Sequence, residues 1–388
     1  MRLGDCGKTN LHTYSDKEKW SLIRYLDTGS ITEGRIDEIQ TLYPGVDKIP
    51  SRARRKASVG DILFSTVRPN QKHYGIIEAG TENLLVSTGF TVVTVDTTIA
   101  DPYFIYYYLT QSSVIESLQA IAEQSTSTYP SIKPSDIEDI ELDLPELETQ
   151  KKIGSTLRML DRKIALNEEI NDNLYEIVNA YYTSLFKDVE CEMTTIGNYA
   201  ERIYSGGTPT TSNAAYWDGT FGWFSSGETR NRFVISTEKS ITQTGIDNSS
   251  TKLASKHDIV MASAGQGFTR GQTSMLLIDT YVNQSVIVIH ADRNILPYLF
   301  WNLANRYEEL RAISDSSSIR GSLTTKMIAA FEIPCANNDV IQTFSGFAWA
   351  VIPQIENNLL ENERLAALRD SLLPKLMTGE IDVSAIQL

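Results

Sequence analysis

Two stretches of the chain place apolar residues at alternating steps of four and three. The first stretch runs through Ile153, Leu157, Leu160, Ile164, Asn167, Asn171, Leu174, Val178, Tyr181 and Leu185. A mean spacing of about 3.5 residues is typical of a helix whose seam packs on another helix in a coiled coil. A helix over residues 150–186 would be about 55 Å long at about 1.5 Å per residue.

The second stretch repeats this pattern 191 residues later. Its positions are Phe344, Ala348, Val351, Ile355, Asn358, Asn362, Leu365, Arg369, Leu372 and Leu376, and only Arg369 breaks the match. Because both seams belong to one chain, we expect an antiparallel helix pair. The repeated asparagines either fix the register of the seam, since a buried amide needs a partner, or lie where the seam splays and is wet. Pro353 falls inside the second pattern and is expected to kink or delay that helix.

Short segments outside the helices repeat at nearly the same distance. The segments pair residues 3–5 with 196–198, 60–63 with 257–260, 87–93 with 283–289, 102–106 with 297–301 and 144–145 with 333–334. Six ordered matches, counting the helices, indicate a tandem duplication. Each copy has alternating strand patterns, then a helix opened by proline (Pro102 or Pro297), then the long helix.

The expected fold is therefore α+β, with two globular heads separated by a pair of long antiparallel coiled-coil helices and related by a pseudo-two-fold duplication. We expect a head over residues 1–148, the central helix over 149–188, a second head over 189–336 and the C-terminal helix over 337–380. A stiff spacer between two similar readers suits a bipartite target.

The net charge of the chain argues against DNA binding by the chain alone. It is −14, from 35 basic and 49 acidic residues, whereas DNA affinity comes largely from Lys and Arg that neutralise phosphates. Positive charge must then be concentrated locally or supplied by partner subunits. Three scattered cysteines, no apolar run long enough for a bilayer and no signal-peptide core lead us to expect a cytoplasmic protein without a metal site.

Several motifs then follow in a defined order. In the second head these are Tyr204-Ser205-Gly206-Gly207-Thr208-Pro209, Tyr216-Trp217, Arg270-Gly271 and Asn283-Gln284. The first head lacks the Gly-Gly-Thr-Pro segment but has Gly60-Asp61-Ile62-Leu63 and Thr66-Val67-Arg68-Pro69-Asn70. This order resembles the target recognition domains of type I restriction-modification specificity subunits, and the resemblance covers essentially the whole chain.

The resemblance implies a role as a non-catalytic subunit. Each head, a target recognition domain, would read one half of a split double-stranded DNA target. The helices would dock two modification (methyltransferase) subunits, and restriction (motor and nuclease) subunits would join them. S-adenosylmethionine, ATP and Mg would belong to those partners, with no cofactor and no metal in this chain.

The candidate DNA-contacting residues are mostly basic. The first head has a dense cluster and a following group, which are Arg52, Arg54, Arg55, Lys56, Arg68, Lys72 and His73. In the second head the candidates are Arg230, Arg232, Arg270, Gln272 and Arg320. Arginine can read guanine with two hydrogen bonds. The alternative for the dense cluster is a solvated loop, and for the others an ordinary surface role. The segment Ser205-Gly206-Gly207 could approach phosphates closely or form a turn.

Other classes of protein fit less well. No phosphate-binding loop, zinc-protease motif or hydrolase nucleophile elbow occurs, and no S-adenosylmethionine loop or methyltransferase signature is found. Two alternatives remain open: a coiled-coil scaffold that binds only proteins, and the specificity chain of a different multi-subunit DNA methyltransferase or nuclease. DNA binding that weakens steeply with salt would separate a reader from a scaffold.

Overall fold

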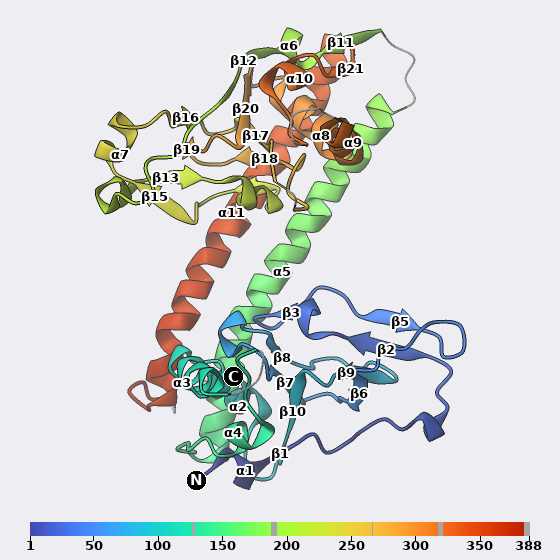
Figure 1. The fold of residues 1–388 in the computed structure, drawn as a ribbon, viewed down its shortest axis with the longest axis vertical. Helices are drawn as coiled ribbons and strands as arrows, with labels where there is room; N and C mark the ends of the chain where they lie inside the picture. Colours follow the sequence, from blue (N-terminus) through green and yellow to red (C-terminus); the bar gives the residue numbers. More distant parts are fainter. Residues whose placement is uncertain (126–128, 188–191, 266, 317–320, 384–388) are drawn as a thin grey trace. The chain divides into compact units, whose positions relative to one another are not determined.

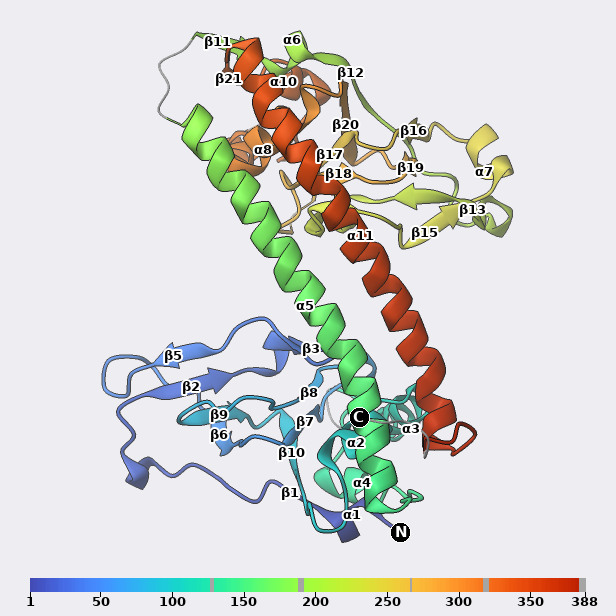
Figure 2. The same cartoon turned by 180° about the vertical axis from the view of Figure 1, so that it is seen from behind.

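The computed structural model describes residues 1–125, 129–187, 192–265, 267–316 and 321–383 (Figures 1 and 2). The chain divides into two compact units. Unit 1 contains Met1–Ile164 and Arg364–Leu388, and unit 2 contains Ala165–Glu363. In the described part of the chain, no helix is long and apolar enough to span a membrane.

Unit 1 is built on two four-stranded sheets. The first has the order β1-β10-β7-β8, with bounds Gly7–Thr9, Phe90–Val95, Ile62–Ser65 and Tyr74–Ile76. The second has the order β5-β2-β9-β6, with bounds Gln40–Leu42, Ile23–Leu26, Leu84–Ser87 and Ala53–Lys56. All pairs are antiparallel except β2 with β9, which run parallel. A two-stranded sheet joins β3 (Ile31–Thr32) to β4 (Arg35–Ile36).

Residues along the strands of the first sheet alternate between two cores. Ile62 and Phe64 join the core under the helices, whereas Leu63 joins the core toward the second sheet. This period of two places one sheet between a helical layer and a second sheet. The helical layer of unit 1 comprises α1 (Leu3–Cys6), α2 (Pro102–Leu109), α3 (Ser112–Glu123) and α4 (Pro134–Glu138), with the two long helices. Asp101 caps α2 by accepting a hydrogen bond from the Phe104 amide, and Pro102 occupies its first turn.

Unit 2 repeats this topology. Its first sheet has the order β12-β20-β17-β18-β14, with bounds Ala200–Ser205, Val286–Ala291, Ile259–Ala262, Thr273–Leu276 and Phe233–Val234. Its second sheet has the order β15-β13-β19-β16, with bounds Lys239–Ile241, Trp217–Phe224, Thr280–Val282 and Lys252–Ala254. The central pair, β13 with β19, is again parallel. A small sheet pairs β11 (Met193–Thr195) with β21 (Glu332–Pro334).

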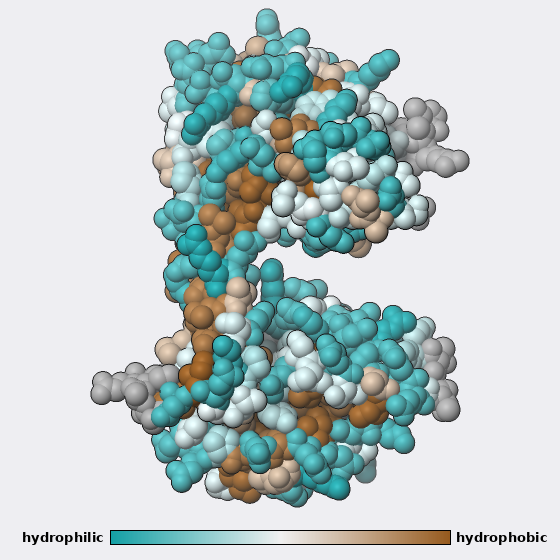
Figure 3. Space-filling model, turned by 90° about the vertical axis from the view of Figure 1, so that its left-hand side faces the viewer, coloured by the Kyte–Doolittle hydropathy of each residue, from teal (hydrophilic) through white to brown (hydrophobic). Residues whose placement is uncertain are grey.

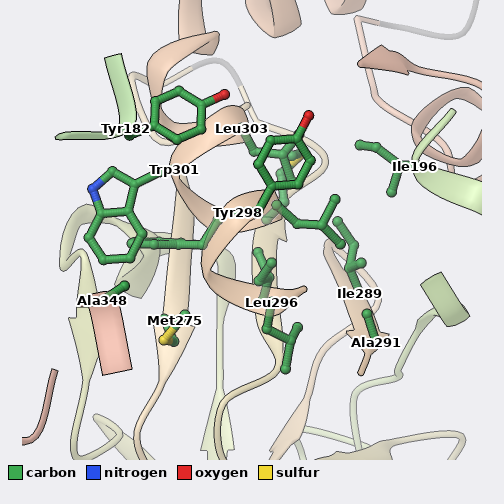
Figure 4. Close-up of a cluster of buried hydrophobic side chains, with 14 of the residues drawn as sticks. Tyr182, Ile196, Met275, Ile289, Ala291, Leu296, Tyr298, Trp301, Leu303 and Ala348 are labelled. Carbon is green, nitrogen blue, oxygen red and sulfur yellow. The ribbon is translucent and has the colours of Figure 1, made fainter. Parts of the chain in front are cut away.

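The helices of unit 2 correspond to those of unit 1, except that α7 has no counterpart there. They are α6 (Ile196–Tyr199), α7 (Gln243–Asp247), α8 (Leu296–Asn305), α9 (Tyr307–Ser316) and α10 (Thr325–Ala329). In its main core, Tyr298 and Trp301 of α8 lie between the strands and the long helices (Figure 4). The ring of Tyr298 is 6.2 Å from that of Tyr182, and the Trp301 ring is 5.8 Å from that of Phe344. Both units are therefore α+β copies of one architecture.

Two helices of 40 residues each complete the fold, α5 (Leu147–Phe186) and α11 (Asn338–Met377). In unit 2, Asn167 donates to Asn362 at 2.8 Å and Asn358 donates to Asn171 at 2.8 Å. Rising numbers in α5 pair with falling numbers in α11, so the helices are antiparallel. Three of the four asparagines are buried, and each pair supplies the partner that a buried amide needs.

The other positions of the repeated pattern are buried or half-buried. Those with little exposed surface are Ile153, Leu157, Ile355 and Leu376, and the half-buried ones are Leu160, Ile164, Leu174, Leu365 and Leu372. The expectation that Pro353 delays the second helix is wrong, because α11 begins well before it and continues through it. The proline ring is exposed, so the backbone carbonyl left without a donor can be hydrated.

Candidate nucleic-acid interface

The dense basic cluster lies on β6 in the second sheet of unit 1, and not on a solvated loop. Arg52, just before the strand, is exposed and Arg54 is half-buried. Lys56 pairs with Glu18 and lies 5.1 Å from the ring of Trp20. Arg55 is half-buried, and burial lowers the pKa of its guanidinium. The strand thus fixes its cations at different depths, and Arg52 is the most available of them.

A second basic group lies on the β7–β8 loop, residues 66–73. Arg68 is exposed in a left-handed conformation with φ of 49°, and its guanidinium lies 5.3 Å from the ring of Tyr129. Lys72 pairs with Glu33 at 2.6 Å. The Nδ1 atom of His73 lies 2.7 Å from the carbonyl oxygen of Ile31. Arg68 has no carboxylate partner among the described residues, so its charge is the one this loop offers to a ligand.

The candidates in unit 2 are mostly engaged within the unit. Arg230 pairs with Glu238, and Arg232 pairs with Asp172 at 3.1 Å. Arg270 is only 7% exposed; it donates to the carbonyl oxygen of Gly321 at 2.7 Å and pairs with Asp315. Gln272 is half-buried, and its Oε1 has no hydrogen-bond partner in the described part of the chain. Arg320 lies outside the described residues.

The fold brings together other groups that sequence reasoning missed. Lys252 and Arg202 lie 5.7 and 5.9 Å from the ring of Tyr204, and Lys239 lies 5.7 Å from the ring of Trp217. A sequence pattern showed the aromatic residues but not these cations: Lys252 and Lys239 come from other strands, and Arg202 lies on the same strand as Tyr204. Phe268 was also missed, and its side chain is 85% exposed.

The Ser205-Gly206-Gly207 segment serves packing inside unit 2. A Cβ atom at Gly206 would clash with the backbone of Val282, and one at Gly207 would clash with Ser250. Glycine is therefore required for close approach of the chain to itself, which leaves no need to invoke a phosphate.

Arg369, which breaks the apolar pattern of the second long helix, lines a cavity of about 350 Å³ in unit 1. Arg369 pairs with Asp161 at 2.6 Å, and Tyr107 donates to the other carboxylate oxygen of Asp161 at 2.5 Å. Desolvation would lower the pKa of Arg369, but its bonds to Asp161 and Asp370 outweigh this and raise the pKa. Burial and the charge of Asp161 raise the pKa of Tyr107 well above the usual tyrosine range. The arginine thus joins α11 to α5 and α2 through a polar network.

The long helix α5 has a second apolar face besides the seam. In unit 2, Leu166 and Ile177 are 50% and 54% exposed. Their spacing of eleven residues places them on one side of the helix. Figure 3 faces the side on which α11 lies in Figure 1, and apolar side chains (brown) reach the surface there as well. Exposed apolar faces of this kind mark protein interaction sites.

The described residues do not form a metal centre, because no group of three or more His, Cys, Asp or Glu side chains gathers among them. The candidate interface offers cations, aromatic rings and backbone groups, the kinds of group that contact phosphates and bases in nucleic-acid complexes.

Comparisons with known proteins agree with this architecture. A family model described as the type I restriction modification DNA specificity domain matches residues 53–176 and again residues 189–339. The specificity subunit of type I restriction enzyme HindI from Haemophilus influenzae is 22% identical over 98% of both chains. That of EcoR124I/EcoR124II from Escherichia coli is 28% identical over 47% of both chains. A solved structure of a type I restriction-modification S subunit from M. genitalium covers 97% of this chain and 95% of its own, with a TM-score of 0.60 and 16% identity.

Proposed function

Since this chain belongs to the family of type I restriction modification DNA specificity domains, we propose that each of its two units reads one half of a bipartite DNA target. The chain is the DNA-sequence specificity subunit of such a system, and subunits of this kind are non-catalytic. A scaffold without DNA readout is not favoured, because the matched domain is a DNA specificity domain.

The observation that carries the proposal is the repeated topology with unlike exposed groups. The second sheets share one strand order with a parallel pair at the centre, and the four strands of the first sheet in unit 1 match four of the five in unit 2, where β14 is added at the edge. The equivalent β7–β8 and β17–β18 connections nevertheless present different side chains, such as Arg68 in unit 1 and Phe268 in unit 2. Two similar scaffolds with different contact groups suit two different half-sites.

The net charge of the chain favours DNA binding that is shared with partner subunits. A chain with a net charge of −14 cannot hold duplex DNA strongly through phosphates alone. Arg52 and Arg68 are exposed cations that could meet DNA in unit 1, while most candidates of unit 2 already have partners. Modification subunits would supply much of the remaining phosphate contact.

The second apolar face of α5 would receive these modification subunits. We propose that the partners are double-stranded DNA, two modification subunits and restriction subunits. Methylation, using S-adenosylmethionine, and ATP- and Mg-dependent cleavage would belong to the partners, with no cofactor in this chain.

Mapping of methylated bases tests the proposal. The chain is co-expressed with its modification subunits in a host that lacks other methyltransferases, and methylated adenines are mapped across the genome. We expect one bipartite motif with an unspecified gap. A continuous motif, or none, would contradict the proposal. The double variant Arg52→Ala with Arg68→Ala lacks both exposed cations. Assembled with the modification subunits, it should support less DNA methylation than the wild type when the salt concentration is raised.

A further inference from the structure

The β17–β18 loop of unit 2, residues 263–272, is braced by one face of α9. Tyr307 donates from its hydroxyl to the carbonyl oxygen of Phe268 at 2.6 Å. Arg311 donates to the carbonyl oxygen of Gly267 at 2.6 Å. Asp315 pairs with Arg270. The three bracing residues follow one another at steps of four, which places them in a row along the helix.

The base of the β17–β18 loop is also fixed. The amide of Gly271 donates to Ala262 at 2.9 Å, and the amide of Gln272 donates to Thr269 at 2.8 Å. Gly271 has a φ of +87°, a conformation that L side chains rarely adopt. Residues 267–272 of the loop are therefore held in one backbone conformation by side chains, hydrogen bonds and a glycine.

Against this fixed backbone, the side chain of Phe268 is 85% exposed. A single exposed apolar residue on a free surface needs no explanation. Here the braces hold the backbone of an aromatic residue in place while its ring contacts water. Pre-positioned aromatic groups of this kind contribute large contact area at low entropy cost when a partner binds.

The charge beside the ring suits a polyanion. One guanidinium nitrogen of Arg311 donates to the loop, and Arg311 pairs with no carboxylate among the described residues. The positive charge of Arg311 therefore lies next to Phe268 without a neutralising partner there. DNA offers phosphates to such a cation and base faces or thymine methyl groups to such a ring.

The equivalent β7–β8 loop in unit 1 is also held on a helix. The amide of Asn70 donates to the side chain of Gln119 on α3 at 3.2 Å, and the loop presents Arg68. Duplication thus places an exposed arginine in one unit and an exposed phenylalanine in the other at the same point of the topology.

We propose that Phe268 is a specificity-determining residue that contacts the bases of the half-site read by unit 2, through its ring and not through a phosphate. This inference rests on the proposed function. Losing one base contact in a duplex target lowers affinity by about tenfold. Because no charge is lost, the dependence of affinity on salt should keep its slope.

The test uses the full chain assembled with its modification subunits and compares the wild type with Phe268→Ala, Phe268→Tyr and Met193→Ala. Met193 is 54% exposed on β11 of the same unit and serves as the matched control. Affinity for target DNA is measured over a range of salt concentrations, and methylated motifs are mapped. Thermal unfolding checks that each variant is folded.

We expect Phe268→Ala to bind about tenfold more weakly with an unchanged salt slope, and to relax one half-site only. Phe268→Tyr keeps the ring and should retain the motif, as should Met193→Ala. An unchanged motif and affinity in Phe268→Ala, a changed salt slope, or relaxation of both half-sites would overturn the assignment. If the wild-type assembly yields no bipartite motif, the proposed function fails first.

Discussion

Replacing Arg369 by valine should destabilise unit 1 locally, because the carboxylate of Asp161 then keeps the hydrogen bond from Tyr107 but loses its cation. The side chains of Asp161 and Arg369 are 32% and 24% exposed, so most of the pair is withdrawn from water. Removing one partner of a buried pair costs about 3–5 kcal/mol, and partial exposure reduces this to about 2–3 kcal/mol.

The equivalent positions of the other unit show which second substitution should compensate for Arg369→Val. At the equivalent positions of unit 2, 191 residues away, stand Ile352 for Asp161 and Val178 for Arg369, and both are buried in the apolar core. The double variant Asp161→Ile with Arg369→Val therefore copies a pairing that the chain already tolerates. Replacing both members of a buried ion pair by apolar side chains is often neutral, but the buried Tyr107 hydroxyl loses its acceptor, which costs about 1 kcal/mol. We therefore expect the double variant within about 1–2 kcal/mol of the wild type.

Hydrogen exchange followed by mass spectrometry measures the local stability. Peptides covering α2 and the last turns of α11 should exchange faster in Arg369→Val and recover in the double variant, with a coupling of about 2 kcal/mol. Peptides of unit 2 serve as the internal control. Additive effects of the two substitutions, or a double variant as unstable as the single one, would refute the reasoning.

Three further outcomes are expected. Inserting one heptad into both α5 and α11 should lengthen the unspecified gap and leave both half-sites unchanged in a methylation map; an altered half-site would count against the helices as spacers. The chain without partners should bind DNA weakly, with affinity that falls steeply with salt in fluorescence anisotropy, and salt-independent retention would speak against phosphate contact. Burial raises the pKa of Asp61, so its contribution to the stability of unit 1 is lost as pH rises from the ordinary aspartate pKa of about 4 through the raised value. Asp61→Asn should remove that part of the pH dependence in urea unfolding, and an unchanged pH profile would contradict this assignment.

The fold was largely predictable because its signals are periodic. The step of four and three along the helices and the repeated short segments predict two α+β copies and an antiparallel helix pair. The expected delay at Pro353 was wrong because a local rule was applied without the tertiary packing that forms α11 ahead of the proline. The break at Arg369 was visible, but its partner Asp161 is more than 200 residues away in the sequence.

The candidate site was less predictable. Sequence shows which residues carry charge, but not that Arg270 is buried against Asp315 or that Arg232 is tied to Asp172. Those partners lie on other elements, so whether a basic side chain is free to contact DNA depends on tertiary packing. Phe268 is not part of a periodic apolar pattern. It could be recognised only from its exposure and from the row of residues on α9 that holds its backbone.

The discontinuity of unit 1 has a consequence for synthesis on the ribosome. Its core includes Leu373 and Leu376 near the end of the chain, together with Ile62 and Phe104 from its beginning. Unit 2, in contrast, is one continuous stretch. During translation the second unit can therefore close its core first, with the beginning of α11, while the first unit keeps apolar surface uncovered until the end of α11 emerges. The segment made earliest completes its folding last, and in that interval it is the part of the nascent chain most exposed to aggregation and to chaperones.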